Sequence, residues 1–196
     1  MSKFLGPIHY WLYGKIGNQE ELTRCLAEAA LRDGKLADID TYVRDLPPLE
    51  TVIDEGNIHG WLQTRIADAE QRYASFVLAL TTKEPDYLDV LVRNAYSFGT
   101  QHALSEGTTP AEAYKAFEDF FVNGMPCDHV NLVTESTDQT LSWTQTRDLH
   151  EDAWSAQGGD VSIYYQLRKS VMDGMLSRSG LALSMPDSDH YTIRLA

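Results

Sequence analysis

The chain has 196 residues, 43% of them hydrophobic, and 29 acidic against 16 basic side chains give a formal net charge of −13. An anionic surface repels phosphate backbones and anionic lipids, so nucleic acid and membrane surfaces are not expected partners. The sequence contains neither an apolar run of the ~20 residues that a membrane helix needs nor a signal peptide, so we expect a cytoplasmic protein.

Apolar residues at helical spacing predict three helices in the first part of the chain. The first is expected over 7–16. The second begins at Asn18 and Glu21, which resemble a capping pair. The third and longest is expected over 57–82, after a proline pair that interrupts the helical pattern.

Helical and strand patterns alternate in the rest of the chain. The clearest start signal is Thr109 followed by Glu112, a capping box ahead of an apolar stripe. Alternation of apolar and polar residues indicates strands. The expected elements are helices over about 86–105, 109–122 and 161–178, a hairpin over 128–147 and a strand over 190–195.

This order of elements is typical of the α+β class. We expect a mostly helical protein in which the helices pack on one face of a small antiparallel sheet, made of the hairpin and the C-terminal strand. The polar face of the sheet is expected to remain exposed. The chain is predicted to be a single domain, 1–196, with a helical N-terminal part, 1–84, and an α+β core, 85–196.

The hairpin has a predicted register. A four-residue turn over 136–139 pairs Glu135 with Thr140 and Leu132 with Trp143. Side chains alternate along a strand, so this register predicts one apolar face. Its members are Val130, Leu132, Leu141 and Trp143.

The same register predicts a cluster of metal-binding residue types at the open end of the hairpin. His129 lies near Asp148 there, with His150 just beyond, and the C-terminal strand adds His190. Imidazole and thiolate suit zinc or iron, and carboxylates orient imidazoles, so these four are candidate metal or cofactor ligands. The spacing matches no established metal motif, and solvated residues at strand ends are the alternative interpretation.

Cys127 is the candidate catalytic residue. It falls beside His129 at the same strand end, where a neighbouring imidazole can activate a thiolate nucleophile. Thiolate chemistry requires partial exposure and a lowered pKa of the thiol, and neither can be read from the sequence.

A short internal repeat suggests a second candidate site. The segments 6–16 and 56–66 share Gly, Ile, His, Trp, Leu and Ile at matching positions, which makes His9 and His59 equivalent. If the two helices pack about a pseudo-twofold axis, these histidines meet and can share a metal ion or a haem iron. The alternative is that each ring simply rests against the core.

Residues 85–196 resemble 4-vinyl reductase domains and L-2-amino-thiazoline-4-carboxylic acid hydrolase-like proteins. The resemblance rests on two helices, then Gly124-Met125-Pro126 leading into the hairpin, a helix, and a final strand that follows Asp187. It implies a small α+β domain that binds a ligand or metal. In that family, cysteines stand where this chain has His150 and His190, so a thiolate-rich site is not implied here.

Three functions are compatible with these patterns. The first is a sensor-like domain that binds a small molecule, a transition metal (zinc or iron) or haem. The second is a small-molecule hydrolase-like enzyme that uses Cys127 or a bound metal. The third is a non-catalytic interaction module that forms a homodimer.

Overall fold

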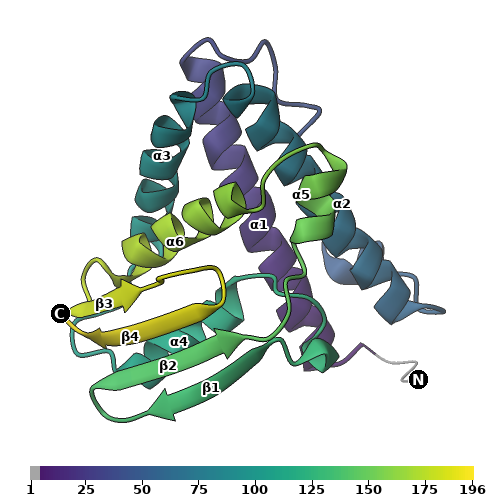
Figure 1. Ribbon diagram of the computed structural model, residues 1–196. Helices are drawn as coiled ribbons and strands as arrows, with labels where there is room; N and C mark the ends of the chain where they lie inside the picture. The colour runs from purple at the N-terminus through teal and green to yellow at the C-terminus, as the bar shows by residue number, and fades with distance from the viewer. Residues whose placement is uncertain (1–4) are drawn as a thin grey trace.

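The computed structural model describes residues 5–196, which form six α-helices and an antiparallel sheet of four strands in the order β1-β2-β4-β3 (Figure 1). The α+β prediction is therefore confirmed. Over these residues, no helix is both long and apolar enough to cross a membrane. The helices are α1 (Pro7–Arg32), α2 (Ile58–Thr81), α3 (Tyr87–Gln101), α4 (Pro110–Phe120), α5 (Glu151–Ala156) and α6 (Ser162–Leu176), with short 3-10 turns at Leu49–Thr51 and Pro126–Asp128. The strands are β1 (Asn131–Ser136), β2 (Thr140–Gln145), β3 (Leu181–Ser184) and β4 (His190–Leu195).

The N-terminal helix is longer than predicted. The sequence predicts a break before Asn18, but α1 continues through this position. The Asn18 side chain donates a hydrogen bond to the backbone carbonyl of Phe120, 3.0 Å away on α4, and so does not cap a new helix. Packing of the apolar face of α1 outweighs the low helix propensity of Gly14 and Gly17.

Two other helix starts follow the capping rules. Thr109 and Glu112 form the predicted capping box, in which the Glu112 carboxylate accepts the Thr109 N–H at 2.9 Å. At the start of α2, the Asn57 side chain accepts a hydrogen bond from the N–H of Gly60 at 3.2 Å. Both contacts satisfy backbone donors that a helix leaves free in its first turn.

The hairpin register differs from the prediction by one residue up to Val133 and by two residues beyond it, where Glu135 pairs with Ser142. Leu132 pairs with Thr144 and Val133 with Trp143, and a bulge follows Val133. Leu132 is consequently 59% exposed and does not belong to the apolar face. The apolar face is formed instead by the paired strands β2 and β4. On this face the rings of Trp143 and Tyr191 stack with their centroids 4.7 Å apart.

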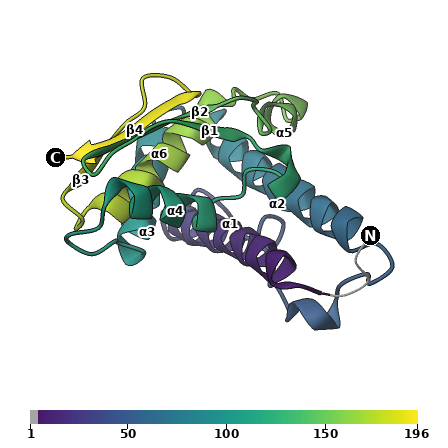
Figure 2. The same ribbon diagram turned by 90° about the horizontal axis from the view of Figure 1, so that it is seen from below.

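The sheet presents its apolar side to the helices. Figure 2 shows the helices on one side of the sheet, with α6 next to it. One hydrophobic core connects α1, α2, α3, α4 and α6 to the inner face of β2 and β4. On the other face Ser142 and Thr192 form a side-chain hydrogen bond of 3.0 Å, which agrees with the predicted polar face.

Helices α3 and α6 approach closely enough that their backbones touch. A Cβ atom added to Gly99 would lie 2.2 Å from the carbonyl oxygen of Val171, and one added to Gly174 would lie 2.3 Å from that of Tyr96. The Ser170 hydroxyl also donates a 2.7 Å hydrogen bond across the crossing to the Val92 carbonyl. The crossing fixes the position of α6, which supports the site described next.

Candidate functional site

The predicted cluster at the hairpin end does not form. His190 is exposed and its Nδ1 bonds to Asp187 at 2.9 Å, while Cys127 lies in a 3-10 turn and is also exposed. His129 follows this turn in the left-handed conformation, with φ of 47°. A turn thus replaces the expected start of the strand. Over residues 5–196, no group of three or more His, Cys, Asp or Glu side chains is arranged to hold a metal ion.

Asp148 has a structural role at the start of α5. Its Oδ1 accepts the backbone N–H of His150 at 2.7 Å and that of Glu151 at 3.0 Å. These contacts satisfy free donors of the first helical turn. They also fix the backbone at the start of α5, and thereby the direction in which the His150 side chain points.

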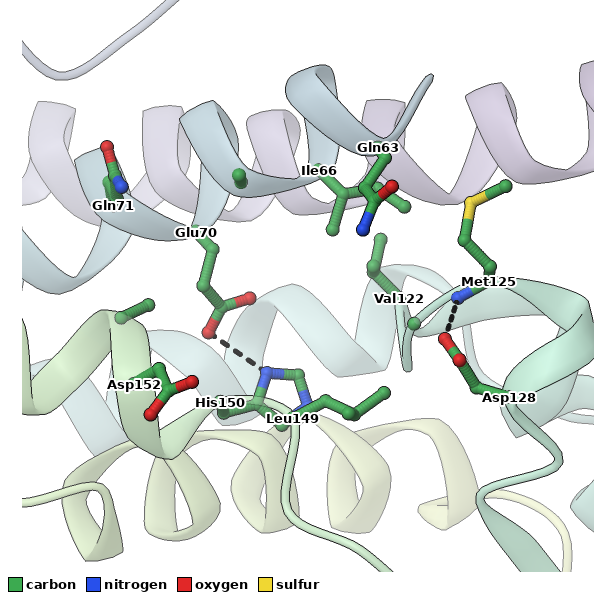
Figure 3. A pocket seen from close by; sticks show the side chains of 13 residues that line it. Gln63, Ile66, Glu70, Gln71, Val122, Met125, Asp128, Leu149, His150 and Asp152 are labelled. Carbon is green, nitrogen blue, oxygen red and sulfur yellow. Dashed lines mark hydrogen bonds and ion pairs between the residues drawn. The ribbon is translucent and has the colours of Figure 1, made fainter. Parts of the chain in front are cut away.

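His150 is turned away from the sheet and toward α2. The residue is only 2% exposed, and its Nδ1 lies 3.0 Å from Oε1 of Glu70 (Figure 3). The Tyr164 ring stacks on the imidazole with centroids 3.9 Å apart, and Tyr165 contacts it edge-on. A carboxylate can only accept a hydrogen bond, so the Nδ1 that faces Glu70 carries the hydrogen. Glu70 and the tyrosines together fix the tautomer and the orientation of the ring.

This pair lines a cavity of about 380 Å³ between α2, α5 and the segment that joins α4 to β1. Ile66, Val122 and Leu149 supply apolar wall, and Glu70, Asp128 and Asp152 supply carboxylates. In Figure 3 the second carboxylate oxygen of Glu70 points toward the middle of this space. Neither Lys nor Arg is among the described residues that line it, so the cavity is electronegative.

The other imidazole nitrogen of His150, Nε2, has no hydrogen-bond partner within residues 5–196. This atom is fully buried. Leaving a buried polar atom unpaired costs about 1–3 kcal/mol, which a ligand atom can recover. With the hydrogen on Nδ1, Nε2 is an acceptor that can bind an N–H or O–H group, or take up a proton from one.

The phenols beneath the imidazole cannot take over its role as a base. Burial raises the pKa of Tyr164 well above its ordinary value, and it raises the pKa of Tyr165 as well. Both phenols therefore remain protonated near neutral pH. The amide N–H of Gln145 donates to the Tyr165 hydroxyl oxygen at 2.6 Å, which fixes the rotamer of that ring.

The two histidines of the internal repeat do meet. Nε2 of His9 and Nε2 of His59 lie 3.4 Å apart beside a hollow of about 140 Å³ that Met125 and Cys127 also line. The backbone N–H of Gly6 donates to Nδ1 of His9 at 2.9 Å. In neutral His9 the hydrogen therefore lies on Nε2 and points at His59. Metal coordination through Nε2 of His9 would require this hydrogen to move and the Gly6 contact to break, and metal binding here stays a prediction.

This arrangement predicts opposite tautomers for the two rings. We expect ¹⁵N chemical shifts at pH above 8 to show His9 with hydrogen on Nε2, and His59 with Nε2 as an acceptor. His59→Ala should leave the His9 tautomer unchanged, because the Gly6 N–H alone determines it. Chemical shifts that place the hydrogen on Nδ1 of His9 would contradict the structure. Nε2 of His9 would then be able to bind a metal ion.

Sequence reasoning missed Glu70, although a signal for it was present. Glu70 follows Ile66 by four residues and precedes Tyr73 by three, so it lies on the apolar stripe of its helix. Lys15 and Arg168 occupy equivalent positions in α1 and α6, and both are buried at 4% exposure. A charged residue on an apolar stripe is expected to be paired or functional.

Comparison of the chain with known protein families, curated proteins and solved structures finds no significant match, so the resemblance to 4-vinyl reductase domains stays a prediction.

Proposed function

We propose that this protein is a small-ligand-binding domain whose ligand occupies the cavity at Glu70 and His150. The observation that carries the proposal is a buried imidazole with one nitrogen fixed by a carboxylate and the other unpaired within residues 5–196. Ligand sites combine apolar walls with a few oriented polar groups in a volume of roughly 300–1,000 Å³. The cavity of about 380 Å³ has this composition and suits a ligand of metabolite size.

The charge of the walls indicates the ligand class. Glu70 and Asp152 face the cavity without a basic side chain among its described lining residues, which favours a cationic group rich in N–H donors. Asp128 contributes less, because it pairs with Arg147 at 3.0 Å and accepts the Met125 N–H at 2.8 Å. Hydrogen bonds between ionised partners are about twice as strong as neutral ones. An amine or amidine is therefore the preferred ligand, with its cation at Glu70.

The hydrolase-like alternative is compatible with the same pair. An imidazole oriented by a carboxylate can act as a general base toward water, so the reactive group would be His150. Cys127 lines a different hollow, beside His9 and His59, and is not among the described residues around this cavity. Turnover of an amidine that His150→Gln abolishes would favour this enzyme function over simple binding.

A series of three isosteric compounds tests the ligand class. Benzamidine, benzamide and benzoate have the same shape and carry a positive, no and a negative charge. We expect benzamidine to bind most tightly by calorimetry and benzoate least, because the carboxylates attract the first and repel the last. Benzamidine should also perturb the His150 ring signals in NMR spectra.

Glu70→Gln is the matched variant. It keeps the size of the side chain but removes its charge. Benzamidine binding should weaken about 10- to 100-fold, because a hydrogen bond to a charged group contributes roughly 1.5–3 kcal/mol. Asp138→Asn, in the exposed hairpin turn, removes the same charge far from the cavity and should leave the affinity unchanged. Equal binding of benzamidine and benzoate, or an unaltered affinity in Glu70→Gln, would refute the proposal.

A further inference from the structure

A second hollow, of about 200 Å³, contains a buried lysine. Trp11 and Lys15 of α1 form one wall, Glu118 of α4 forms another, and the segment 123–131 closes it. Lys15 is 4% exposed and follows Trp11 by four residues, on the side of α1 that faces the core. This hollow shares Gly124 and Met125 with the Glu70–His150 cavity, but neither Glu70 nor His150 lines it.

The amine of Lys15 lacks the partner that a buried lysine usually has. Within residues 5–196, its Nζ makes no hydrogen bond or ion pair, and it rests over the Trp11 ring, 4.1 Å from the centroid. Burial lowers the pKa of Lys15 to about 8, the attraction of Glu118 opposes this shift, and the positive charge of Arg168 adds to it. A much larger fraction of this amine is therefore unprotonated near neutral pH than in an exposed lysine.

The surrounding side chains provide proton transfer and hydrogen bonding. Glu118 accepts a hydrogen bond from the Asn131 amide at 2.7 Å, and no cation pairs with it over the described residues. It lines the same hollow as Lys15, so its carboxylate can contact a compound bound there and relay a proton within it. The Oδ1 of Asn123, which also lines the hollow, is buried without a hydrogen-bond partner in the described part of the chain. This amide oxygen can accept a hydrogen bond from a hydroxyl group of a bound compound.

We propose that Lys15 forms an imine with a small, uncharged hydroxyaldehyde or hydroxyketone bound in this hollow. The unprotonated Nζ attacks the carbonyl carbon, the π electrons move to oxygen, and transfer of one proton from nitrogen to oxygen gives a carbinolamine. The Glu118 carboxylate then takes the remaining N–H proton of the carbinolamine and passes it to the hydroxyl group, and water leaves as the C=N bond forms. The net reaction joins an amine and a carbonyl compound and releases one water, without any oxidant or reductant.

The charges near Lys15 select the carbonyl compound. Glu118 and Asp119 are the carboxylates that act on the amine, and a keto acid would bring a further negative charge beside them. A phosphorylated sugar is disfavoured for the same reason. The apolar wall at Ile8 and Trp11 and the small volume admit a short carbon chain, and Asn123 and Asn131 can hold its hydroxyl groups.

Reductive trapping on the full chain tests the proposal. The protein is incubated with glycolaldehyde and sodium cyanoborohydride, which reduces an imine to a stable secondary amine, and the modified lysines are found by peptide mass mapping. We expect Lys15 to react at least ~10-fold faster than the exposed Lys83 at pH 7.5, because more of its amine is unprotonated. The rate at Lys15 should reach half its maximum near pH 8.

Control experiments distinguish a binding site in the folded protein from the intrinsic reactivity of a lysine side chain. The advantage of Lys15 over Lys83 should vanish in urea, and Glu118→Gln should slow modification of Lys15 without changing that of Lys83. Lys15→Arg keeps a buried cation and should remove the fast-reacting site, with its circular dichroism spectrum showing an intact fold. Pyruvate should modify Lys15 more slowly than glycolaldehyde does. Modification of Lys15 no faster than Lys83, an advantage that persists in urea, or faster reaction with pyruvate would overturn the proposal.

Discussion

Gly174→Ala is expected to lower the free energy of unfolding by about 3 kcal/mol or more, the upper range for overpacking a well-filled interior. The new Cβ would lie 2.3 Å from the Tyr96 carbonyl oxygen and 2.9 Å from the Cα of Gly99. These are backbone atoms, so they cannot rotate away as a side chain would. Helices α3 and α6 must separate, which also stretches the bond from Ser170 to Val92. Urea denaturation measures the change.

Gly14→Ala is the matched control. Gly14 is an exposed helical residue of α1, and a Cβ there would meet no heavy atom within 4 Å over residues 5–196. The same substitution should therefore stabilise the protein by about 0.5–1 kcal/mol through helix propensity. Similar effects at both positions would show that the helix crossing is looser than the structure indicates. Because α6 carries Tyr164, which stacks on His150, Gly174→Ala should also weaken benzamidine binding.

Helical periodicity predicted most of the fold correctly. The apolar stripes over 57–82 and 161–178 correspond to α2 and α6, and the capping box at Thr109 gives the start of α4. These signals are local, since a helix makes its hydrogen bonds within four residues. The error at Asn18 shows the limit of such signals, because a capping residue type also serves as a donor to a distant carbonyl.

The sheet was harder to predict because its outer strands have weak patterns. Leu132 and Val133 are adjacent and both substantially exposed, at 59% and 41%, so the apolar residues of β1 do not indicate which face is buried. A shift of one residue moves every side chain to the other face. Strand β3, Leu181–Ser184, was missed because four residues are too few for an alternating pattern.

The candidate sites show which signals carry information over long distances. Glu70 and His150 are 80 residues apart, and no spacing rule connects them. The contact between His9 and His59 was one of two interpretations of the repeat, which compares two helices and so suggests how they could pack. The predicted hairpin cluster failed because its residues lie on a turn, a helix start and an exposed strand end.

Arg72→Leu, at the contact between α1 and α2, is expected to lower the free energy of unfolding by about 3–5 kcal/mol. The Arg72 guanidinium makes a two-pronged contact with Glu20 of α1, and it also bonds to Asp68 at 3.0 Å and to the Tyr42 carbonyl at 2.8 Å. The side chains of Arg72 and Glu20 are only 11% and 6% exposed. Removal of the cation leaves the Glu20 carboxylate buried and uncompensated.

The double variant Glu20→Leu/Arg72→Leu separates pairing from packing. It removes both charges, so it should recover most of the stability that Arg72→Leu loses, because the desolvation cost disappears with the pair. Arg24→Leu is the exposed counterpart. Arg24 pairs with Asp45, whose side chain is 98% exposed, and its loss should change stability by no more than about 0.5 kcal/mol. If the double variant is no more stable than Arg72→Leu, the loss reflects the contacts of Arg72 with Asp68 and Tyr42. Recovery would instead show that the loss in Arg72→Leu comes from the buried, unpaired Glu20 carboxylate, and that apolar packing holds α1 against α2 without the pair.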